Sequence, residues 1–171
     1  MMHTRHAVCD TVLGKVTLVA AGDSIVGLYF PQHWVQPSPQ SLGEKVDVDD
    51  DAVMAAALAQ LTEYLNGERK AFALKTATHG NPFEERVWAL LNDIPIGETT
   101  TYGDLAERLG DRSLAQAVGQ AVGHNPISIV VPCHRVIGKN GKLTGYAGGL
   151  ERKQFLLDLE EPDLVKSAKL F

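Results

Sequence analysis

The sequence ISIVVPCHRVIG, residues 127 to 138, joins a short apolar run to a cysteine, a histidine and an arginine. The run from Ile127 to Val131 predicts a buried strand, because β-branched residues favour extended backbone. This strand would place Cys133 at its end. A buried cysteine is usually an inert small hydrophobic group, but a neighbouring base and cation, here His134 and Arg135, favour the nucleophilic thiolate. We therefore expect Cys133 to be a reactive nucleophile.

A turn, a loop and a helix follow the cysteine. Asn140-Gly141 is a strong signal for a hairpin turn, because both residue types accept positive φ. The glycine-rich run from Gly145 to Gly149 predicts an active-site loop, and Leu150 to about Leu159 predicts a last helix.

Three short helices precede the cysteine, each after a residue that can cap it. They are a helix after Asn81 that starts at Pro82 and ends at Pro95-Ile96-Gly97, one after Thr101 from Tyr102 to Leu109, and one after Ser113 from Leu114 to about Gly123. Two short helices joined by a turn containing glycine are typical of a helix-turn-helix, although many small helical domains share this pattern.

The N-terminal part has the pattern of a small antiparallel sheet followed by a helix. Apolar pieces between residues 5 and 30 are separated by turn residues at Gly14 and Gly22-Asp23. Residues 31 to 47 contain several prolines and predict a loop. The remaining expected elements are a helix from Ala52 to Leu65, capped within Asp49-Asp50-Asp51 and ended by Asn66-Gly67, and a short strand near Phe72 to Leu74.

The stretch from His79 to Pro82 has linker character, and the chain changes pattern there. We expect two domains, residues 1–79 and 80–171. The expected fold class is α+β: a small N-terminal sheet-plus-helix domain, then a mostly helical C-terminal domain with a helix-turn-helix and an active-site loop.

The net charge of −5 is unevenly distributed along the 171 residues. Seven basic and two acidic residues lie between Arg108 and Lys153, whereas the rest of the chain carries nine basic and nineteen acidic residues. A basic stripe that could contact nucleic acid is therefore available, although a solvated face with scattered cations would have the same composition.

Other classes of protein are disfavoured. No apolar run approaches the roughly 20 residues that span a bilayer, and the start of the chain lacks the apolar core of a secretory signal, so we expect a cytoplasmic protein with no membrane partner. Only two cysteines occur, Cys9 and Cys133, and we interpret both as reduced thiols. Neither they nor the histidines have the spacing of metal ligands, so we expect no metal site.

The residues around Cys133 resemble the active-site segment of the O6-alkylguanine-DNA alkyltransferases, also called methylated-DNA–protein-cysteine methyltransferases. The resemblance is dense over residues 80 to 160 and loose before them, and it is closest to the stand-alone form of the family. Besides Ile129 to Gly138, it is carried in the family's order by Phe83, Val87-Trp88, Ile94 to Thr99, Tyr102, Ala117-Val118-Gly119, Asn125-Pro126 and Gly145 to Gly149.

The resemblance implies single-turnover repair of double-stranded DNA: Cys133 takes an alkyl group from the O6 atom of a guanine that has been flipped out of the duplex, without a cofactor. His134 would deprotonate Cys133 through a water molecule, and Glu160 would orient His134. Activity on O4-alkylthymine is left open. We expect a monomer, and clustering on DNA is left open.

The resemblance also implies roles for other residues. Asn125 would brace the turn beside the active site, and Tyr102 would bind guanine N3 or donate a proton as the base leaves. Three of the residues named for the site could instead have no part in the chemistry: Asn125 could be an ordinary turn residue, Tyr146 a core aromatic and Glu160 a solvated carboxylate. The substrate pocket would include Tyr146, Ala147 and Val136, and the DNA contacts would include Arg112, Ala115, Gln116, Ala117 and Arg135.

Gln116 departs from the family pattern, in which most members have an arginine that fills the space left by the flipped base. Glutamine can stack and form hydrogen bonds there but lacks the attraction of a cation for phosphate, so we expect weaker DNA binding or slower flipping. Arg112, one turn earlier, could compensate in part.

Two rival functions remain open. The chain could be a helix-turn-helix binding module that recognises alkylguanine without repairing it, although such relatives lack the cysteine of this motif. It could instead be a thiol hydrolase with a Cys-His pair, which would release its product and regain the thiol. The stoichiometry of the reaction separates these possibilities.

Overall fold

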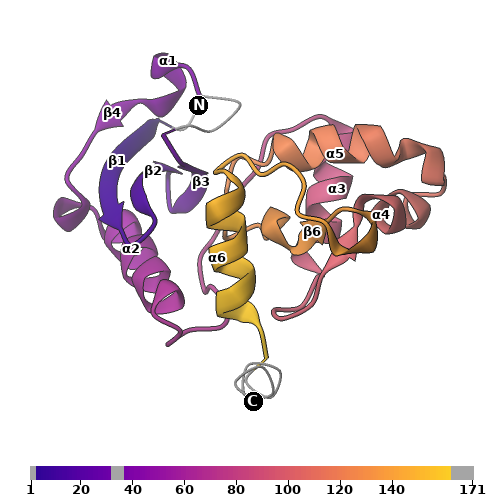
Figure 1. Cartoon of the computed structure of the whole chain (residues 1–171). Helices are drawn as coiled ribbons and strands as arrows, with labels where there is room; N and C mark the ends of the chain where they lie inside the picture. Colours follow the sequence, from indigo (N-terminus) through magenta and orange to yellow (C-terminus); the bar gives the residue numbers. More distant parts are fainter. Residues whose placement is uncertain (1–2, 32–36, 163–171) are drawn as a thin grey trace, which may run out of the picture.

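Two halves pack on either side of the last helix, as Figure 1 shows for this computed structural model. The structure describes residues 3–31 and 37–162. We call residues 4–78 the sheet half and residues 82–162 the helical half. Within the described residues, none of the helices has the length and apolar character needed to cross a membrane.

The sheet half contains the expected antiparallel strands. They are β1 (Thr4–Thr11), β2 (Gly14–Ala21) and β3 (Ser24–Tyr29), and the tight turns fall at the predicted glycines. A short strand that the sequence does not announce, β4 (Glu44–Lys45), pairs in parallel with β1 and completes the order β3-β2-β1-β4. It lies in the segment expected to be a loop, together with the short helix α1 (Pro39–Leu42).

Helix α2 (Ala52–Leu65) packs against this sheet and follows the single turn η1 (Val48–Asp50). It begins as predicted, because the Asp51 carboxylate accepts hydrogen bonds from the backbone N–H groups of Val53 and Met54. It buries Met54, Ala57, Leu61, Tyr64 and Leu65.

The helical half contains the expected short helices. Helix α3 (Pro82–Asn92) has a reciprocal capping box between Asn81 and Glu84, and α4 (Tyr102–Arg108) is capped by Thr101. The other elements are β5 (Thr100–Thr101), η2 (Arg112–Leu114), α5 (Ala115–Gly123), η3 (Cys133–Arg135), β6 (Val136–Ile137), η4 (Lys139–Gly141) and α6 (Leu150–Glu160).

The predicted strand from Ile127 to Val131 is wrong. These residues form buried turns, with Ile129 at a φ of 73° and only an isolated bridge from Ile127 to Leu28. A run of buried apolar residues fits a compact turn as well as a strand, and here the side chain of Asn125 supplies backbone partners that a strand neighbour would otherwise provide.

Three smaller expectations are also corrected. Residues Phe72 to Leu74 form no strand, and the bridge to Ile25 falls at Thr76 instead. Ser113 does not cap the third helix, because Asp111 caps the preceding turn η2 and Ser113 is the donor. Asn140 and Gly141 do turn the chain with positive φ, but no hairpin forms, since β6 pairs in parallel with β5.

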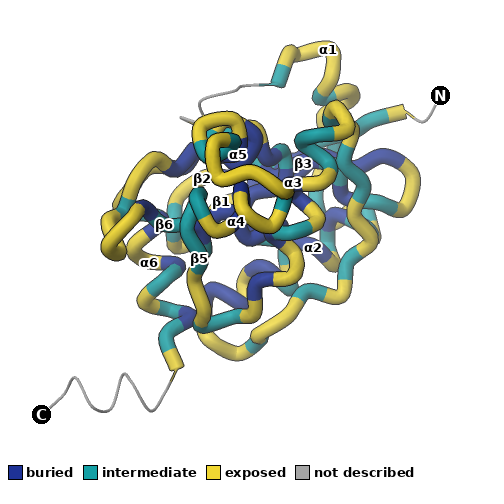
Figure 2. The backbone as a smooth tube through the Cα atoms, turned by 90° about the vertical axis from the view of Figure 1, so that its right-hand side faces the viewer, coloured by how far each residue is buried: buried dark blue, intermediate teal, exposed yellow. Residues whose placement is uncertain are grey.

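One hydrophobic core runs through both halves, from the sheet and α2 to the helices around Trp88. The Trp88 indole N–H, for example, donates to the Ala121 carbonyl oxygen at 2.8 Å and ties α3 to α5. Figure 2 shows buried backbone in the interior and exposed turns on the outside of α4 and α5. The core therefore holds the helix-turn-helix at the surface and the cysteine segment inside.

Candidate active site

Cys133 lies in the single turn η3 and is 3% exposed. The buried turns before it are anchored to the sheet half, because the Leu28 N–H donates to the Pro126 carbonyl oxygen at 2.8 Å. The Cys133 N–H donates back to the Val131 carbonyl oxygen at 2.8 Å. The cysteine is therefore delivered by a rigid turn rather than by a strand.

Asn125 is buried and bonded at both ends of its side chain. Its Nδ2 donates to the Val131 carbonyl oxygen at 2.8 Å, and its Oδ1 accepts from the Ile127 N–H at 3.0 Å. The two bonds span the turn that leads to Cys133. Asn125 is therefore not an ordinary exposed turn residue, because its side chain stabilises the turn before Cys133.

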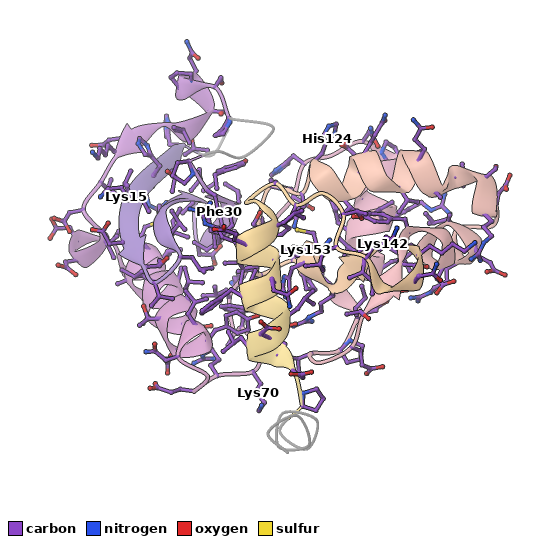
Figure 3. All side chains as sticks on the ribbon, viewed as in Figure 1. Lys15, Phe30, Lys70, His124, Lys142 and Lys153 are labelled. Atoms are coloured by element: carbon purple, nitrogen blue, oxygen red, sulfur yellow. The ribbon has the colours of Figure 1, made fainter. Side chains whose placement is uncertain are left out.

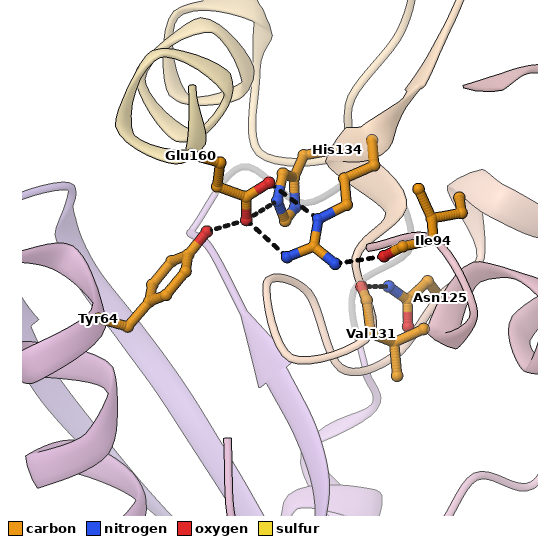
Figure 4. Close-up of polar contacts among 7 residues, drawn as sticks. Tyr64, Ile94, Asn125, Val131, His134 and Glu160 are labelled. Carbon is orange, nitrogen blue, oxygen red and sulfur yellow. Dashed lines mark hydrogen bonds and ion pairs between the residues drawn. The ribbon is translucent and has the colours of Figure 1, made fainter. Parts of the chain in front are cut away.

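The Glu160 carboxylate is the centre of a buried polar network (Figure 4). His134 Nε2 donates to Oε2 at 2.8 Å. Arg135 binds both oxygens, Nε to Oε1 and a terminal nitrogen to Oε2, each at 2.8 Å. The Tyr64 hydroxyl also donates to Oε2. Burial raises the pKa of Glu160, but the hydrogen bonds outweigh it and bring the pKa down to about 2, so the carboxylate is ionised at neutral pH.

His134 is fully buried and electrically neutral at pH 7. Burial lowers its pKa from 6.5, although the hydrogen bond to Glu160 opposes this shift. Since ionised Glu160 can only accept, the imidazole proton sits on Nε2 and leaves Nδ1 as an acceptor. Nδ1 has no hydrogen-bond partner among the residues that the structure describes. A buried acceptor without a partner, in the residue that follows the cysteine, is suited to act as a general base.

The cation that influences Cys133 is not the one the sequence suggests. Burial raises the pKa of the Cys133 thiol, and the Asn125 side chain and the charge of Lys153 partly oppose this rise. Arg135 instead directs its guanidinium at Glu160 and at the Ile94 carbonyl oxygen. The thiol therefore needs a base to ionise it at neutral pH.

Lys153 was missed by sequence reasoning. It is completely buried, its Nζ donates to the Thr144 carbonyl oxygen at 2.8 Å, and burial lowers its pKa to about 8. In Figure 3 it projects from α6 toward the helical half. The helix period could have found it, because Lys153, Leu156 and Glu160 recur on one face and Glu160 was already expected inside.

The loop after Lys142 closes over the site. Tyr146 and Ala147 are buried, as is Val136 in β6, and the Tyr146 hydroxyl has no hydrogen-bond partner among the described residues. The Tyr102 hydroxyl lies 3.5 Å from Thr144 Oγ1, and burial raises the pKa of Tyr102, so this phenol stays protonated.

Arg152 ties this loop to the sheet half. Its Nε donates to the Leu13 carbonyl oxygen and a terminal nitrogen to that of Gly148, both at 2.9 Å. Its guanidinium also lies 4.7 Å from the centre of the Phe30 ring. A side chain at Gly148 would collide with Phe30, since an added Cβ would lie 2.5 Å from that ring.

The outer face of α5 carries the side chains expected at DNA. Gln116 and Ala117 are exposed and Ala115 is half-buried. Arg112 is exposed but held by carboxylates of α4, at 2.6 Å from Glu107 and 3.6 Å from Asp104. These carboxylates partly offset the charge that Arg112 could offer to DNA.

Fewer cations are available at the surface than the basic stripe in the sequence suggests. Lys153 is buried, the Arg135 side chain is 12% exposed and bonded to Glu160, and Arg112 is paired with carboxylates. Arg135 thus faces the protein interior rather than a DNA surface. The exposed cations of the stripe include Arg108, Lys139 and Lys142. Across residues 3–31 and 37–162, no cluster of His, Cys, Asp and Glu is arranged to hold a metal ion.

Comparisons with known proteins cover both halves. The family model described as the 6-O-methylguanine DNA methyltransferase DNA binding domain matches residues 82–162, and the model of the ribonuclease-like domain of the same methyltransferase matches residues 4–78. A methylated-DNA–protein-cysteine methyltransferase of Mycolicibacterium paratuberculosis is 44% identical over 95% of each chain. A constitutive methyltransferase of the same name from Bacillus subtilis is 41% identical, over 91% of this chain and 94% of the relative.

A solved structure agrees with these sequence matches. The crystal structure of Mycobacterium tuberculosis OGT in complex with DNA superimposes with a TM-score of 0.81 at 38% identity, and covers 94% of this chain and 97% of that one. Matching family models over both halves, together with close relatives over nearly the whole length, leave one assignment. The chain belongs to the 6-O-methylguanine DNA methyltransferase family.

Proposed function

We propose that this protein repairs DNA directly, by transferring an alkyl group from the O6 atom of guanine in duplex DNA to Cys133. The observation that carries the proposal is the buried thiol beside a neutral histidine whose other nitrogen is bound to an ionised carboxylate. This arrangement supports the roles of nucleophile, base and orienting group for Cys133, His134 and Glu160. Relatives along the whole chain are named methylated-DNA–protein-cysteine methyltransferases.

The reaction is a single displacement. The Cys133 sulfur attacks the alkyl carbon, a sulfur–carbon bond forms, and the bond from that carbon to guanine O6 breaks with its electron pair going to the guanine. The thiol proton passes through water to His134 Nδ1, and guanine recovers a proton from the Tyr102 hydroxyl, which His134 replenishes. S-alkylcysteine and unmodified guanine result, and the thiol is not regenerated.

The burial of Cys133 requires the damaged nucleotide to leave the stacked duplex, at a cost of roughly a few kcal/mol. The Tyr146 ring, the Ala147 backbone N–H and Val136 would line the pocket and hold the base. Helix α5 would bind from the minor groove, with Gln116 in the space that the base vacates and Ala115 and Ala117 against the backbone. The position of these residues in the family pattern, and their burial or exposure in the structure, support these proposed roles.

Intact mass measurement tests the proposal. The protein is incubated with a short duplex that contains one O6-methylguanine, and we expect one added methyl group per molecule, absent in Cys133→Ala. Cys9→Ala is the matched control, because Cys9 is also a buried free thiol and should not affect labelling.

The rival functions give different results. Repeated turnover with an unmodified protein would indicate a hydrolase. A folded protein that binds the duplex without gaining mass would indicate a binding module and would refute the proposal. A monomeric state and a cytoplasmic location stay predictions from the sequence, and activity on O4-alkylthymine stays open.

A further inference from the structure

The chemistry proposed above uses residues of the helical half, yet one side chain of the sheet half reaches into it. Tyr64 lies in the last turn of α2 and is 2% exposed, and its hydroxyl donates a hydrogen bond to Glu160 Oε2 across 96 positions of sequence. Figure 4 shows Tyr64 approaching the carboxylate from one side, while His134 approaches it from another.

We propose that Tyr64 is a positioning residue for alkyl transfer: its hydroxyl fixes Glu160 Oε2 so that this oxygen faces His134 Nε2. The proposal rests on the proposed function. It gives the sheet half a role in the chemistry that is separate from packing.

The hydrogen bonds of Glu160 show why a further donor matters. Arg135 binds the carboxylate through both oxygens, and this fork alone would hold Glu160 in the plane of the guanidinium. His134 must share Oε2 with that fork. Tyr64 adds a third donor to Oε2, from an element outside the η3 segment that carries the other two. The position of this oxygen is therefore fixed from both halves of the molecule.

Tyr64 is suited to this task because it is itself immobile and always protonated. Its ring packs against Phe72, with the ring centres 5.1 Å apart. Burial and the nearby Glu160 carboxylate raise the pKa of the Tyr64 hydroxyl far above 10, so it acts only as a donor toward Glu160 at any pH at which the protein functions. Helix α2 is held by its Asp51 cap, which also pairs with Arg5.

The test is Tyr64→Phe, which removes the hydroxyl and keeps the ring. We expect the rate of methyl transfer at saturating O6-methylguanine duplex to fall about tenfold or more, with the Kd for the duplex unchanged. The rate should fall at acidic pH as His134 becomes protonated, and we call this part of the pH–rate profile the acidic limb. In Tyr64→Phe we expect the acidic limb to move to lower pH, because a loosely held Glu160 stabilises the protonated form of His134 less. Tyr29→Phe is the matched control, since it removes a hydroxyl from the same half and should leave rate and limb unaltered.

A merely structural role predicts other results. If Tyr64→Phe lowers the melting temperature but transfers methyl at the wild-type rate with an unmoved acidic limb, the inference is overturned. A limb that moves to higher pH overturns it too, because Tyr64 would then only compete with His134 for Oε2. In a Glu160→Gln background the effect of Tyr64→Phe on the rate should vanish, and persistence would show that Tyr64 does not act through Glu160.

A variant that does not fold, and a failure of the proposed function, can each be distinguished from a failure of the inference about Tyr64. If Tyr64→Phe does not fold, 3-fluorotyrosine at position 64 retains the hydroxyl as a stronger donor; the limb should then move to higher pH, and an unmoved limb overturns the inference. If the wild-type protein gains no methyl group, the proposed function fails. If the wild type is labelled and Tyr64→Phe is labelled equally fast, only the role of Tyr64 fails.

Discussion

The interior around Glu160 and the outer face of α5 lie in the same half of the molecule but are built on different principles. In the interior the Glu160 carboxylate binds several groups at once, because it accepts from His134, Arg135 and Tyr64. On α5 the exposed side chains of Gln116 and Ala117 project from the helix into solvent. A change at Glu160 should therefore disturb several functions at once, and a change on α5 only one.

Glu160→Gln should have the largest effect of any change that leaves Cys133 in place. It removes the negative charge that stabilises protonated His134 and leaves Arg135 facing a neutral amide in a buried site. We expect transfer to slow by about 10²-fold or more, and the free energy of unfolding to fall by about 3–5 kcal/mol. Single-turnover labelling and urea denaturation measure the two losses.

Asp158→Asn is the control for this variant, because Asp158 lies on the same helix but is exposed. It should change neither quantity appreciably. If Glu160→Gln slowed transfer without loss of stability, the interior would behave like the surface, and the contrast between the two regions would be broken.

The second largest effect should be the pH dependence of the transfer rate, which reflects the protonation of His134. Its pKa in the folded protein lies below the ordinary value of 6.5. As the pH falls through that lowered value, His134 gains a proton and can no longer accept one from Cys133, so the rate should fall about tenfold per pH unit. Since the pKa of Glu160 is about 2, that carboxylate contributes nothing to this limb.

The free energy of unfolding should also depend on the protonation of His134. The unfolded chain binds the His134 proton more tightly than the native protein does, so the free energy of unfolding should decrease as the pH drops from 6.5 toward the folded pKa. Rate and stability profiles of a His124→Gln variant, which changes an exposed histidine, should retain both trends. An acidic limb that lies above pH 6.5 would contradict a neutral, buried His134.

Lys153→Met should have a smaller effect, confined to the thiol. The charge of Lys153 lowers the pKa of Cys133, so its loss should raise that pKa further and slow transfer by about tenfold for each unit. Stability should change little, because a buried cation is replaced by an apolar chain of similar length. The pH dependence of Cys133 alkylation by iodoacetamide measures the shift, and Lys15→Met, on the sheet surface, is the control.

The contrast between the two regions also explains which parts of the fold could be predicted. Helices α2, α3 and α4 follow from local signals, a capping side chain and the spacing of apolar residues. The turns from Ile127 to Val131 could not be predicted, because they depend on Asn125 and on β3, which is distant in sequence. The β5–β6 pair consists of two residues on each strand and has no sequence signal.

Prediction of the candidate site was limited in the same way. Cys133 and His134 are adjacent in one motif, and Asn125 and Glu160 were suggested by family position; the structure connects His134 to Glu160 and places Asn125 on the turn before Cys133. Lys153 was recoverable from helix periodicity once Glu160 was expected inside. Tyr64 was not recoverable, because no spacing rule connects residues 96 positions apart. Long-range hydrogen bonds of this kind depend on how the two halves pack.

On the α5 face the informative change is Gln116→Arg. A new cation there should contact DNA that glutamine does not attract, because Arg112 is already held by Glu107 and Asp104. We expect a several-fold tighter Kd for duplex DNA, with a dependence of log K on log salt that is steeper by about 0.9. Titrations at several salt concentrations measure both.

If the outer face of α5 and the interior around Glu160 act separately, Gln116→Arg should speed labelling only when the substrate is duplex DNA that the protein must bind. At subsaturating O6-methylguanine duplex the rate should rise several-fold, whereas the reaction with the free O6-alkylated base should be unchanged, since that base reaches Cys133 without flipping. The melting temperature should also be unchanged, because Gln116 is exposed. A faster reaction with the free base would mean that position 116 acts through the pocket, and that the surface and the interior are coupled.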